Sequence, residues 1–242
     1  MPTLLASTPK ISPHSVAKSG RVLYAFSSFY LPFYGCGLDF LFNNYDIFGC
    51  VSAAIYFIDE LVEARSPTAS IQRHLRVLSQ YLGEKMEYDH AIYRLFDDAR
   101  RYYRFEAKIL QRHDAYSLAD LLDITARRSF DFRLMHRCLL QLSARACDDD
   151  VFAWFRAFEI RMEIEDDLQS FMEDSLAGTF NVLSLAKSRC PVEASRIISN
   201  YLRSIDEELE ARSRALSKAQ QSRCRYVLKK YREIVKEIPV PE

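Results

Sequence analysis

The chain contains few residues that break helices, and this scarcity limits the folds open to it. Among 242 residues there are only 6 Gly and 8 Pro, whereas helix-forming residues are abundant. No stretch alternates apolar and polar residues between turn signals, which is the pattern typical of a half-buried strand. The sequence therefore predicts an all-α fold, and the length suffices for one domain with a sizeable core.

The predicted organisation is a short leader followed by one domain. Residues 1–20 are rich in Ser, Pro and Lys and lack the apolar core of a signal peptide, so we expect a flexible leader. Residues 21–242 show no internal repeat and no linker, which predicts a single helical domain. Pro32 and Gly35 are expected to divide the apolar stretch 21–42 into two helices. Further helices are expected at about residues 46–64, 69–82, 84–112, 117–147, 148–177 and 195–237.

The balance of charge and the spacing of cysteines argue against several classes of protein. Lys plus Arg equal Asp plus Glu at 33 each, so no net field attracts nucleic acid or an acidic membrane surface. The cysteines show no CxxC spacing and the sequence shows no secretory leader, and both observations predict reduced thiols in a cytoplasmic protein. Residues 22–42 are long enough to cross a bilayer but contain Pro32 and Asp39, so no membrane span is expected.

One acidic block places three oxygen-bearing side chains on a single helix face. Asp166, Ser170 and Asp174 are at i, i+4 and i+8, so they stay within about 80° and span roughly 12 Å of the helix. Such a stripe suits a hard divalent cation such as Mg²⁺, whereas a solvated acidic face is the alternative. Residues 151–162 are apolar on several faces, which predicts a largely buried helix. Since buried carboxylates are costly unless they are paired or hold a metal, we favour the metal site.

A second acidic block, Asp59-Glu60-Leu61-Val62-Glu63, ends another strongly apolar helix. Asp59 and Glu63 are at i and i+4 and share a face, whereas Glu60 points about 100° away. As candidate metal ligands we therefore rank Asp59 first, Glu63 second and Glu60 third. The acidic run at 148–150 is expected to cap a helix, because carboxylates favour helix N-termini.

Both blocks resemble metal motifs of the class I terpene cyclases, in the isoprenoid synthase superfamily. The run from Asp166 to Asp174 (DDLQSFMED) is similar to the second motif, which reads Asn/Asp, Asp, aliphatic, any, Ser/Thr, three residues and Glu. It departs only at Asp174, which stands in place of Glu. Residues 176–183 (LAGTFNVL) resemble a family segment with Gly and then Asn-aliphatic-aliphatic. Residues 59–63 resemble the aspartate-rich first motif, with Glu60 at its second position.

The resemblance implies a fold, a cofactor and a reaction. The fold would be antiparallel helices around a central apolar cavity with both metal motifs at its mouth. Mg²⁺, as three ions, would clamp the diphosphate of a linear prenyl diphosphate, and farnesyl diphosphate would be ionised and cyclised to a sesquiterpene. A prenyltransferase or other prenyl-coupling enzyme of the same fold, and a non-catalytic helical binding protein, stay open as alternatives. The balance of charge predicts no nucleic-acid partner, and a homodimer stays open.

The resemblance also assigns residues to the diphosphate. A paired Arg in the family often contains a diphosphate sensor, and Arg127 and Arg128 lie at such a place in the helix expected at 117–147. The Gly usual one turn later is replaced by Asp131-Phe132. Adjacent helical residues point about 100° apart, and we favour Arg128 as the inward one because Asp131 follows one turn later.

Two further sets of candidates come from the resemblance. Arg225-Tyr226 resembles the Arg-Tyr pair that also donates to diphosphate, although a solvated basic face is equally expected there. Aromatic faces stabilise cations, so the substrate and its carbocation need aromatic neighbours. The substrate-binding candidates are Tyr56, Phe57, Phe152 and Phe155.

Overall fold

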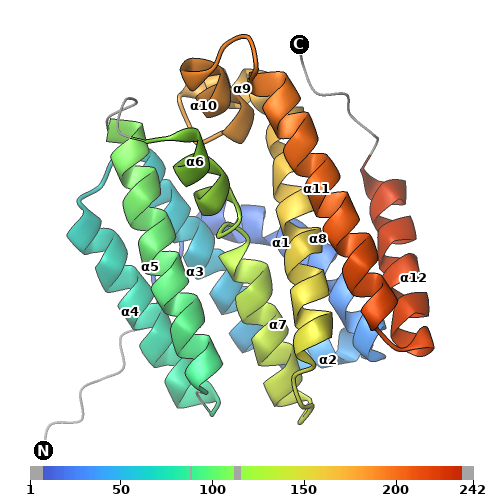
Figure 1. Cartoon of the computed structure of the whole chain (residues 1–242). Coiled ribbons are helices and arrows are strands. Elements are labelled where there is room, and N and C mark those ends of the chain that lie inside the picture. The colour runs from blue at the N-terminus through green and yellow to red at the C-terminus, as the bar shows by residue number, and fades with distance from the viewer. Residues whose placement is uncertain (1–7, 88, 112–115, 236–242) are drawn as a thin grey trace, which may run out of the picture. The chain divides into compact units, whose positions relative to one another are not determined.

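The computed structural model describes residues 8–87, 89–111 and 116–235, in which the regular elements are helices joined by turns and loops, with no strand. The prediction of an all-α fold is therefore confirmed (Figure 1). The helices are α1 (Pro13–Tyr34), α2 (Leu38–Asn43), α3 (Tyr45–Glu63), α4 (Thr68–Lys85), α5 (His90–Gln111), α6 (Leu118–Thr125), α7 (Phe130–Leu142), α8 (Asp149–Gln169), α9 (Phe171–Ala177), α10 (Val182–Arg189), α11 (Ala194–Ala215) and α12 (Lys218–Ile234).

Contacts between helices divide the chain into two compact units that interleave along the sequence. Unit 1 comprises Met1–Arg104 and Phe130–Ala146, and unit 2 comprises Phe105–Ser129 and Cys147–Glu242. The sequence analysis expected one domain over 21–242. The first acidic block lies in unit 1 and the second in unit 2, so each block is supported by its own set of neighbours.

Unit 1 is organised around α3, which is apolar on nearly every face. This helix packs against α1, α4 and α7, as its composition requires. Aromatic side chains join these helices: the Phe26 ring centroid lies 5.0 Å from that of Tyr30 and 5.2 Å from that of Phe48. The Tyr30 ring in turn stacks on Phe132 of α7 at 5.9 Å. The candidate first motif therefore lies at the end of a helix that packs in the core of unit 1.

Unit 2 is organised around α8, which packs against α6, α9, α10 and α11. Trp154 and Phe158 of α8 are fully buried, with ring centroids 5.6 Å apart and nearly parallel planes. Tyr231 of α12 packs edge-on against Phe158 at 5.2 Å. The buried first half of α8 agrees with the apolar residues expected there, and it leads directly into the second acidic block.

The helix α1 begins inside the stretch predicted to be a flexible leader. Ser12 accepts a hydrogen bond from the backbone N–H of Ser15 and forms a capping box, and Pro13 occupies the first turn. Residues 13–20 are therefore helical, and Ser19 is buried. That part of the prediction is wrong, because Ser and Pro were taken as signs of disorder where they form a cap. Residues 1–7 lie outside the described residues.

Two expected helices are interrupted at residues that are neither Gly nor Pro. The helix expected at 117–147 ends with α6 at Thr125 and resumes with α7 at Phe130, and Ser129 between them has a left-handed φ of 58°. The helix expected at 148–177 is divided at Ser170 into α8 and α9. Both interruptions fall on candidate site residues, so they change the geometry expected there.

Several smaller expectations can be compared with the helix boundaries. Asp148 accepts from the backbone N–H groups of Asp150 and Val151, which confirms that the acidic run caps α8. Gly35 ends α1 in the left-handed region with a φ of 66°, while Pro32 lies inside the last turn of that helix. Within the described ranges, no helix combines the length and the apolar character needed to cross a membrane.

Candidate metal centre

The second acidic block lies at the break between α8 and α9. Ser170 ends α8 and starts α9, with φ −87° and ψ 3°. Its hydroxyl oxygen lies 2.5 Å from Oδ2 of Asp174 and 2.9 Å from the backbone oxygen of Asp166. The break therefore keeps Ser170 and Asp174 in direct contact, with Asp166 one turn earlier and exposed.

Asp174 is held in one orientation by donors from the following loop. Gly178 ends α9 in the left-handed region with a φ of 68°, and this turns the chain back toward Asp174. Thr179 Oγ1 then donates to Oδ1 of Asp174 at 3.2 Å, and Asn181 Nδ2 donates to Oδ2 at 2.9 Å. The carboxylate of Asp174 thus has Ser170, Thr179 and Asn181 as neighbours that fix its position.

Asn181 connects this loop to the core of unit 2. The side chain is fully buried, and its Nδ2 also donates to the backbone oxygen of Asp167 at 2.6 Å. Its Oδ1 accepts from the backbone N–H groups of Leu183 and Ser184, each at 3.1 Å, and so caps α10. The sequence analysis noted this Asn in the tail that resembles the family but gave it no role. The Asn before an apolar run was the cap signal that could have identified it.

The buried carboxylate of the block belongs to Asp167, which the sequence analysis did not select. Its side chain is 2% exposed, and Arg128 Nη1 donates to both of its oxygens at 2.7 Å. The backbone N–H of Val182 donates to Oδ2 at 2.7 Å as well. Burial raises the pKa of Asp167 to about 6, whereas Arg128 and Val182 oppose that rise. Asp167 is therefore an ionised internal anchor at neutral pH.

Arg128 fastens the turn after α6 to the end of α8. Besides Asp167, its Nη2 lies 3.2 Å from Oε2 of Glu163, and its guanidinium lies 5.0 Å from the centre of the Phe180 ring. The neighbouring Ser129 donates to Oε1 of Glu163 at 2.7 Å. Three elements of unit 2 thus meet at one cation: the α6 turn, α8 and the loop before α10.

The expected relation of Arg128 to Arg127 and Asp131 needs correction. Because α6 ends at Thr125, the two arginines do not lie on one continuous helix, and the angle of 100° between them does not apply. Arg127 turns to Asp123, with Nε 3.0 Å from Oδ2 at an exposed position. Asp131 lies in the first turn of α7, where its Oδ1 accepts from the backbone N–H of Phe132 at 2.8 Å. Whether either arginine binds diphosphate stays a prediction.

The carboxylates of the first acidic block have separate partners within unit 1. Tyr103 of α5 donates to Oδ1 of Asp59 at 2.7 Å. Ser12, the cap of α1, donates to Oε1 of Glu60 at 2.7 Å. Lys18 Nζ lies 3.9 Å from Oε1 of Glu63.

This arrangement gives Asp59 and Glu60 different partners, as their helical phase requires. Tyr103 was not identified from the sequence, because a buried Tyr in an otherwise charged helix carries no distinctive signal. The role of the first block in binding metal stays a prediction.

The aromatic candidates differ in how far they are buried. Phe155 is fully buried, with its ring 5.1 Å from that of Trp154, and forms part of the core of unit 2. Phe152 is half-buried on α8. In unit 1, Tyr56 and Phe57 are both half-buried on α3, and Phe57 packs edge-on against His74 at 5.3 Å.

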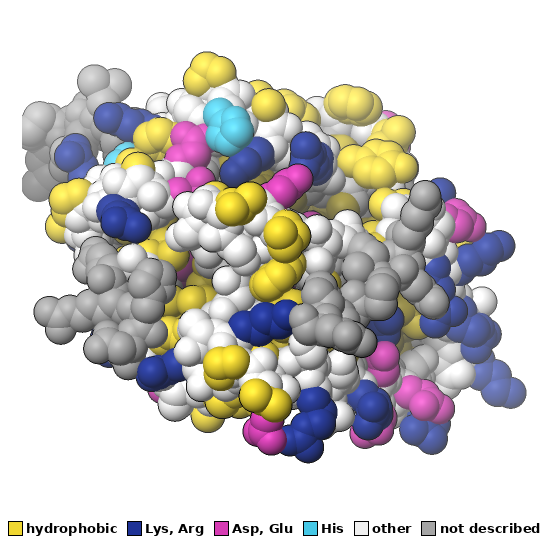
Figure 2. All heavy atoms as spheres, turned by 90° about the horizontal axis from the view of Figure 1, so that it is seen from above, with side chains coloured by type: hydrophobic (Ala, Val, Ile, Leu, Met, Phe, Trp, Pro, Cys, Tyr) yellow, Lys and Arg dark blue, Asp and Glu magenta, His cyan; other side chains and the backbone are white. Residues whose placement is uncertain are grey.

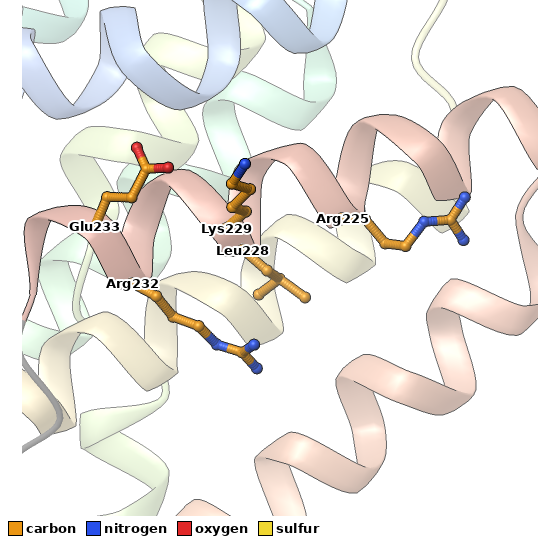
Figure 3. A pocket seen from close by; sticks show the side chains of 5 residues that line it. All are labelled: Arg225, Leu228, Lys229, Arg232 and Glu233. Atoms are coloured by element: carbon orange, nitrogen blue, oxygen red, sulfur yellow. The ribbon is translucent and has the colours of Figure 1, made fainter.

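The Arg225-Tyr226 pair lies on the exposed side of α12. Tyr226 is 48% exposed, and Arg225 lines a surface cavity on this helix (Figure 3). The residue of α12 that reaches the acidic end of α8 is Tyr231, which donates to Oε2 of Glu165. Burial and the neighbouring Glu165 carboxylate raise the pKa of Tyr231, so this hydroxyl stays protonated and remains a donor.

The donor set of the second block fits a hard divalent cation. Asp166, Ser170 and Asp174 offer only oxygen, which Mg²⁺ prefers, and Mg²⁺ commonly uses one or two carboxylates together with water and phosphate oxygens. Among the described residues, Oδ2 of Asp174 accepts from Ser170 and Asn181, whereas Oδ1 accepts from Thr179 and keeps a lone pair.

The carboxylates alone would not complete such a site. In the parts of the chain that the structure describes, no three His, Cys, Asp or Glu side chains converge as a ready metal site. An ion bound here would therefore also use the Ser170 hydroxyl, water or substrate oxygens.

Comparison with known proteins leaves this local chemistry as the main guide to function. No protein-family model, curated protein or solved structure matches the chain.

Proposed function

We propose that the chain is a Mg²⁺-dependent enzyme of the class I terpene synthase type. It would ionise a linear prenyl diphosphate, farnesyl diphosphate in the first instance, and cyclise it to a sesquiterpene. The observation that carries the proposal is the contact between Ser170 and Asp174 at the α8–α9 break, beside Asp166. The all-α architecture, a helical core rich in aromatic side chains, supports it.

The proposed metal ligands are Asp166, Ser170 and Asp174. Mg²⁺ bound there would act as a Lewis acid toward the departing diphosphate. Thr179 and Asn181 serve this chemistry by holding the Asp174 carboxylate before substrate arrives, since a ligand fixed in advance loses little conformational freedom on binding. Neither side chain competes for the metal, because each is already directed at Asp174 as a hydrogen-bond donor.

Arg128 has a positioning role in this proposal. Its guanidinium is shared between Asp167 and Glu163, so a diphosphate would have to compete with two carboxylates for the same donors. The contact with Asp167 instead fixes the α6 turn against the residue that follows Asp166. Arg128 therefore acts on the proposed metal ligands through Asp167, whose position fixes the end of α8 next to Asp166.

One observation favours a second candidate, a non-catalytic helical binding protein. Asp59, Glu60 and Glu63 each have their own partner in Tyr103, Ser12 and Lys18, which is the pattern of carboxylates used for structure. A prenyl-coupling enzyme is the third candidate, and the Ser between Asp166 and Asp174 favours cyclisation over it by resemblance to the cyclase motif.

The deciding experiment measures diphosphate release from the purified full chain. Geranyl, farnesyl and geranylgeranyl diphosphates are each incubated with Mg²⁺ and with a chelator, and volatile products are identified by mass. The proposal expects release that requires Mg²⁺, with a cyclic hydrocarbon from one substrate. Activity only after addition of isopentenyl diphosphate would identify the coupling enzyme. Absence of release from all three substrates would contradict catalysis and favour the binding protein.

A further inference from the structure

Three large apolar side chains lie exposed within eight consecutive residues of unit 1. Leu38 and Phe42 of α2 are 57% and 67% exposed, and Tyr45 at the start of α3 is 49% exposed. Single exposed apolar residues are normal in folded proteins, and on the face that Figure 2 shows they reach the surface in separate groups among charged side chains. A local concentration of large apolar residues, in contrast, is typical of a surface that binds a partner.

The helix α2 buries few of its own side chains. It is 6 residues long, Leu41 is buried and Phe40 is half-buried. Leu38 and Phe42 are four residues apart and therefore share the outward face of the helix. A helix this short is marginal in water unless packing stabilises it. Covering Leu38 and Phe42 would supply that packing.

The ring of Tyr45 is held in place by a glycine of the core helix α3. Gly49 lies one turn after Tyr45 and is buried. A methyl group at Gly49 would lie only 2.8 Å from Cε1 and 2.9 Å from Cζ of Tyr45, so the ring rests directly on bare backbone. Glycine lowers the stability of a helix interior relative to alanine. The seat that it gives to an exposed aromatic ring explains its presence in this helix.

Two residues at the end of α4 extend this surface. Tyr81 donates to the backbone oxygen of Asp46 at 2.8 Å, and Lys85 Nζ lies 2.9 Å from Oδ2 of the same residue. Lys85 also lies 5.7 Å from the centre of the Tyr81 ring. Both side chains are thereby held beside Tyr45, the residue before Asp46. We call Leu38, Phe42, Tyr45 and Tyr81 the α2 corner.

The charges around the α2 corner select the class of partner. Asp39 and Asp46 are acidic and Lys85 is basic, and Lys85 is paired with Asp46. Among the described residues, the corner therefore lacks the excess of cations that binding to nucleic acid or to an anionic lipid surface requires. A two-fold contact between identical chains presents the same surface from both sides, so that one surface must contain both acids and bases. Asp39 and Lys85 give the corner both signs.

The exposed apolar area is a large part of what a dimer requires. A fully covered Phe or Tyr side chain buries roughly 150–250 Å². At 67% and 49% exposure, Phe42 and Tyr45 together leave roughly 170–290 Å² uncovered, before Leu38 and Tyr81 are added. One side of a standard interface buries roughly 800 Å², of which somewhat more than half is non-polar. Aromatic rings are also the side chains that are enriched in the centre of such interfaces.

We propose that the α2 corner is the contact between two copies of this chain, related by a two-fold axis. Leu38 and Phe42 pack against the same corner of the second copy. Tyr45, on its Gly49 seat, is a rigid anchor that loses little conformational freedom on binding. Tyr81 and the Asp46–Lys85 pair form the polar rim. The proposal does not depend on the function proposed for the second acidic block.

The test measures the mass of the full chain by sedimentation equilibrium over a range of protein concentrations. Hydrogen exchange at residues 38–45, compared at low and high concentration, locates the contact. Phe42→Ser removes the most exposed ring of the corner, and Gly49→Ala adds a methyl group that displaces the Tyr45 ring although alanine favours the helix. The matched control is Tyr24→Ser, which removes a ring that is 58% exposed on α1. Urea unfolding shows that each variant is folded.

Wild type and Tyr24→Ser are expected to pass from 28.2 kDa toward twice that mass as concentration rises, with slower exchange at residues 38–45. Phe42→Ser and Gly49→Ala should each raise the dissociation constant about tenfold or more, because central aromatic anchors carry much of the binding energy. A mass of 28.2 kDa at every concentration would overturn the proposal and leave the corner to a different partner. Equal weakening by Tyr24→Ser, unchanged exchange at residues 38–45 in the dimer, or growth beyond two copies would overturn it as well.

Discussion

The contact between Arg128 and Asp167 makes a prediction that can be worked out in detail. Asp167 is 2% exposed and Arg128 is 16% exposed as side chains, so Arg128→Met leaves a buried carboxylate without its cation. Breaking a buried pair from one side typically costs about 3–5 kcal/mol. The backbone N–H of Val182 still donates to Asp167 in the variant. We therefore expect Arg128→Met to lower the free energy of unfolding by about 3 kcal/mol at pH 8, the low end of this range.

The size of this loss should depend on pH. Burial raises the pKa of Asp167 from 3.8 to about 6, so the folded chain holds more protons than the unfolded chain between these values. The contribution of Asp167 to the free energy of unfolding therefore falls as pH rises from about 4 to about 6, and levels off above. Arg128 lowers the pKa of Asp167, so this pKa is higher in Arg128→Met. In the variant, the free energy of unfolding therefore continues to fall with rising pH above pH 6. Lowering the pH from 8 to 5 should therefore reduce the difference in the free energy of unfolding between wild type and Arg128→Met.

The assay is urea unfolding followed by the fluorescence of Trp154, the single Trp, which is buried in unit 2. Arg127→Met is the matched control, because Arg127 pairs with Asp123, whose side chain is 64% exposed. That variant should lose under about 0.5 kcal/mol at either pH. Adding Asp167→Leu to Arg128→Met should restore stability, since the unpaired buried charge is then gone. A loss in Arg128→Met no greater than in Arg127→Met, or no change between pH 8 and pH 5, would refute the reasoning.

Three further predictions concern the acidic blocks. Ser170→Ala and Asp174→Ala should each abolish Mg²⁺-dependent diphosphate release while the circular dichroism spectrum stays that of wild type, and near-normal release in both would contradict the metal assignment. Asp59→Asn should reduce that release far more than Glu60→Gln, because Glu60 is engaged with the cap of α1; steady-state kinetics would reveal a reversed ranking. Asn181→Ala should lower the free energy of unfolding by about 1 kcal/mol through the lost α10 cap, and should also raise the Mg²⁺ concentration needed for half-maximal release. A stability loss without the change in Mg²⁺ requirement would restrict Asn181 to a capping role.

The fold class followed from composition, but the interruptions of its helices did not. Scarce Gly and Pro predicted helices, and the acidic run before Val151 predicted the cap of α8. The breaks at Ser129 and Ser170 occur without Gly or Pro. At the first break, Ser129 donates to Glu163, 34 residues away, and no local pattern shows a contact of that kind. At the second break, Ser170 contacts Asp174 four residues later; helical phase predicts that pair, but it does not predict that the helix is interrupted there.

The candidate site was predicted in part for a similar reason. Helical phase placed Ser170 and Asp174 on one face, and the structure brings them into contact. Phase alone could not show which of Asp166 and Asp167 is buried, because α8 is apolar on several sides before this point. Asp167 is buried against Arg128, and Arg128 lies in the turn after α6 ends at Thr125, a turn that the sequence analysis did not predict.

The break at Ser170 also has a consequence for local opening. The short helix α9 contributes no buried residue, so separating it from α8 exposes little apolar surface. Segments of this kind open with a small free energy and exchange their backbone amide hydrogens faster than the core. Asp174 therefore lies on a helix whose amides are expected to exchange readily. The hydrogen bonds from Thr179 and Asn181 hold its carboxylate in place. A bound cation would add a further link across the break, and slower amide exchange in α9 would report its arrival directly.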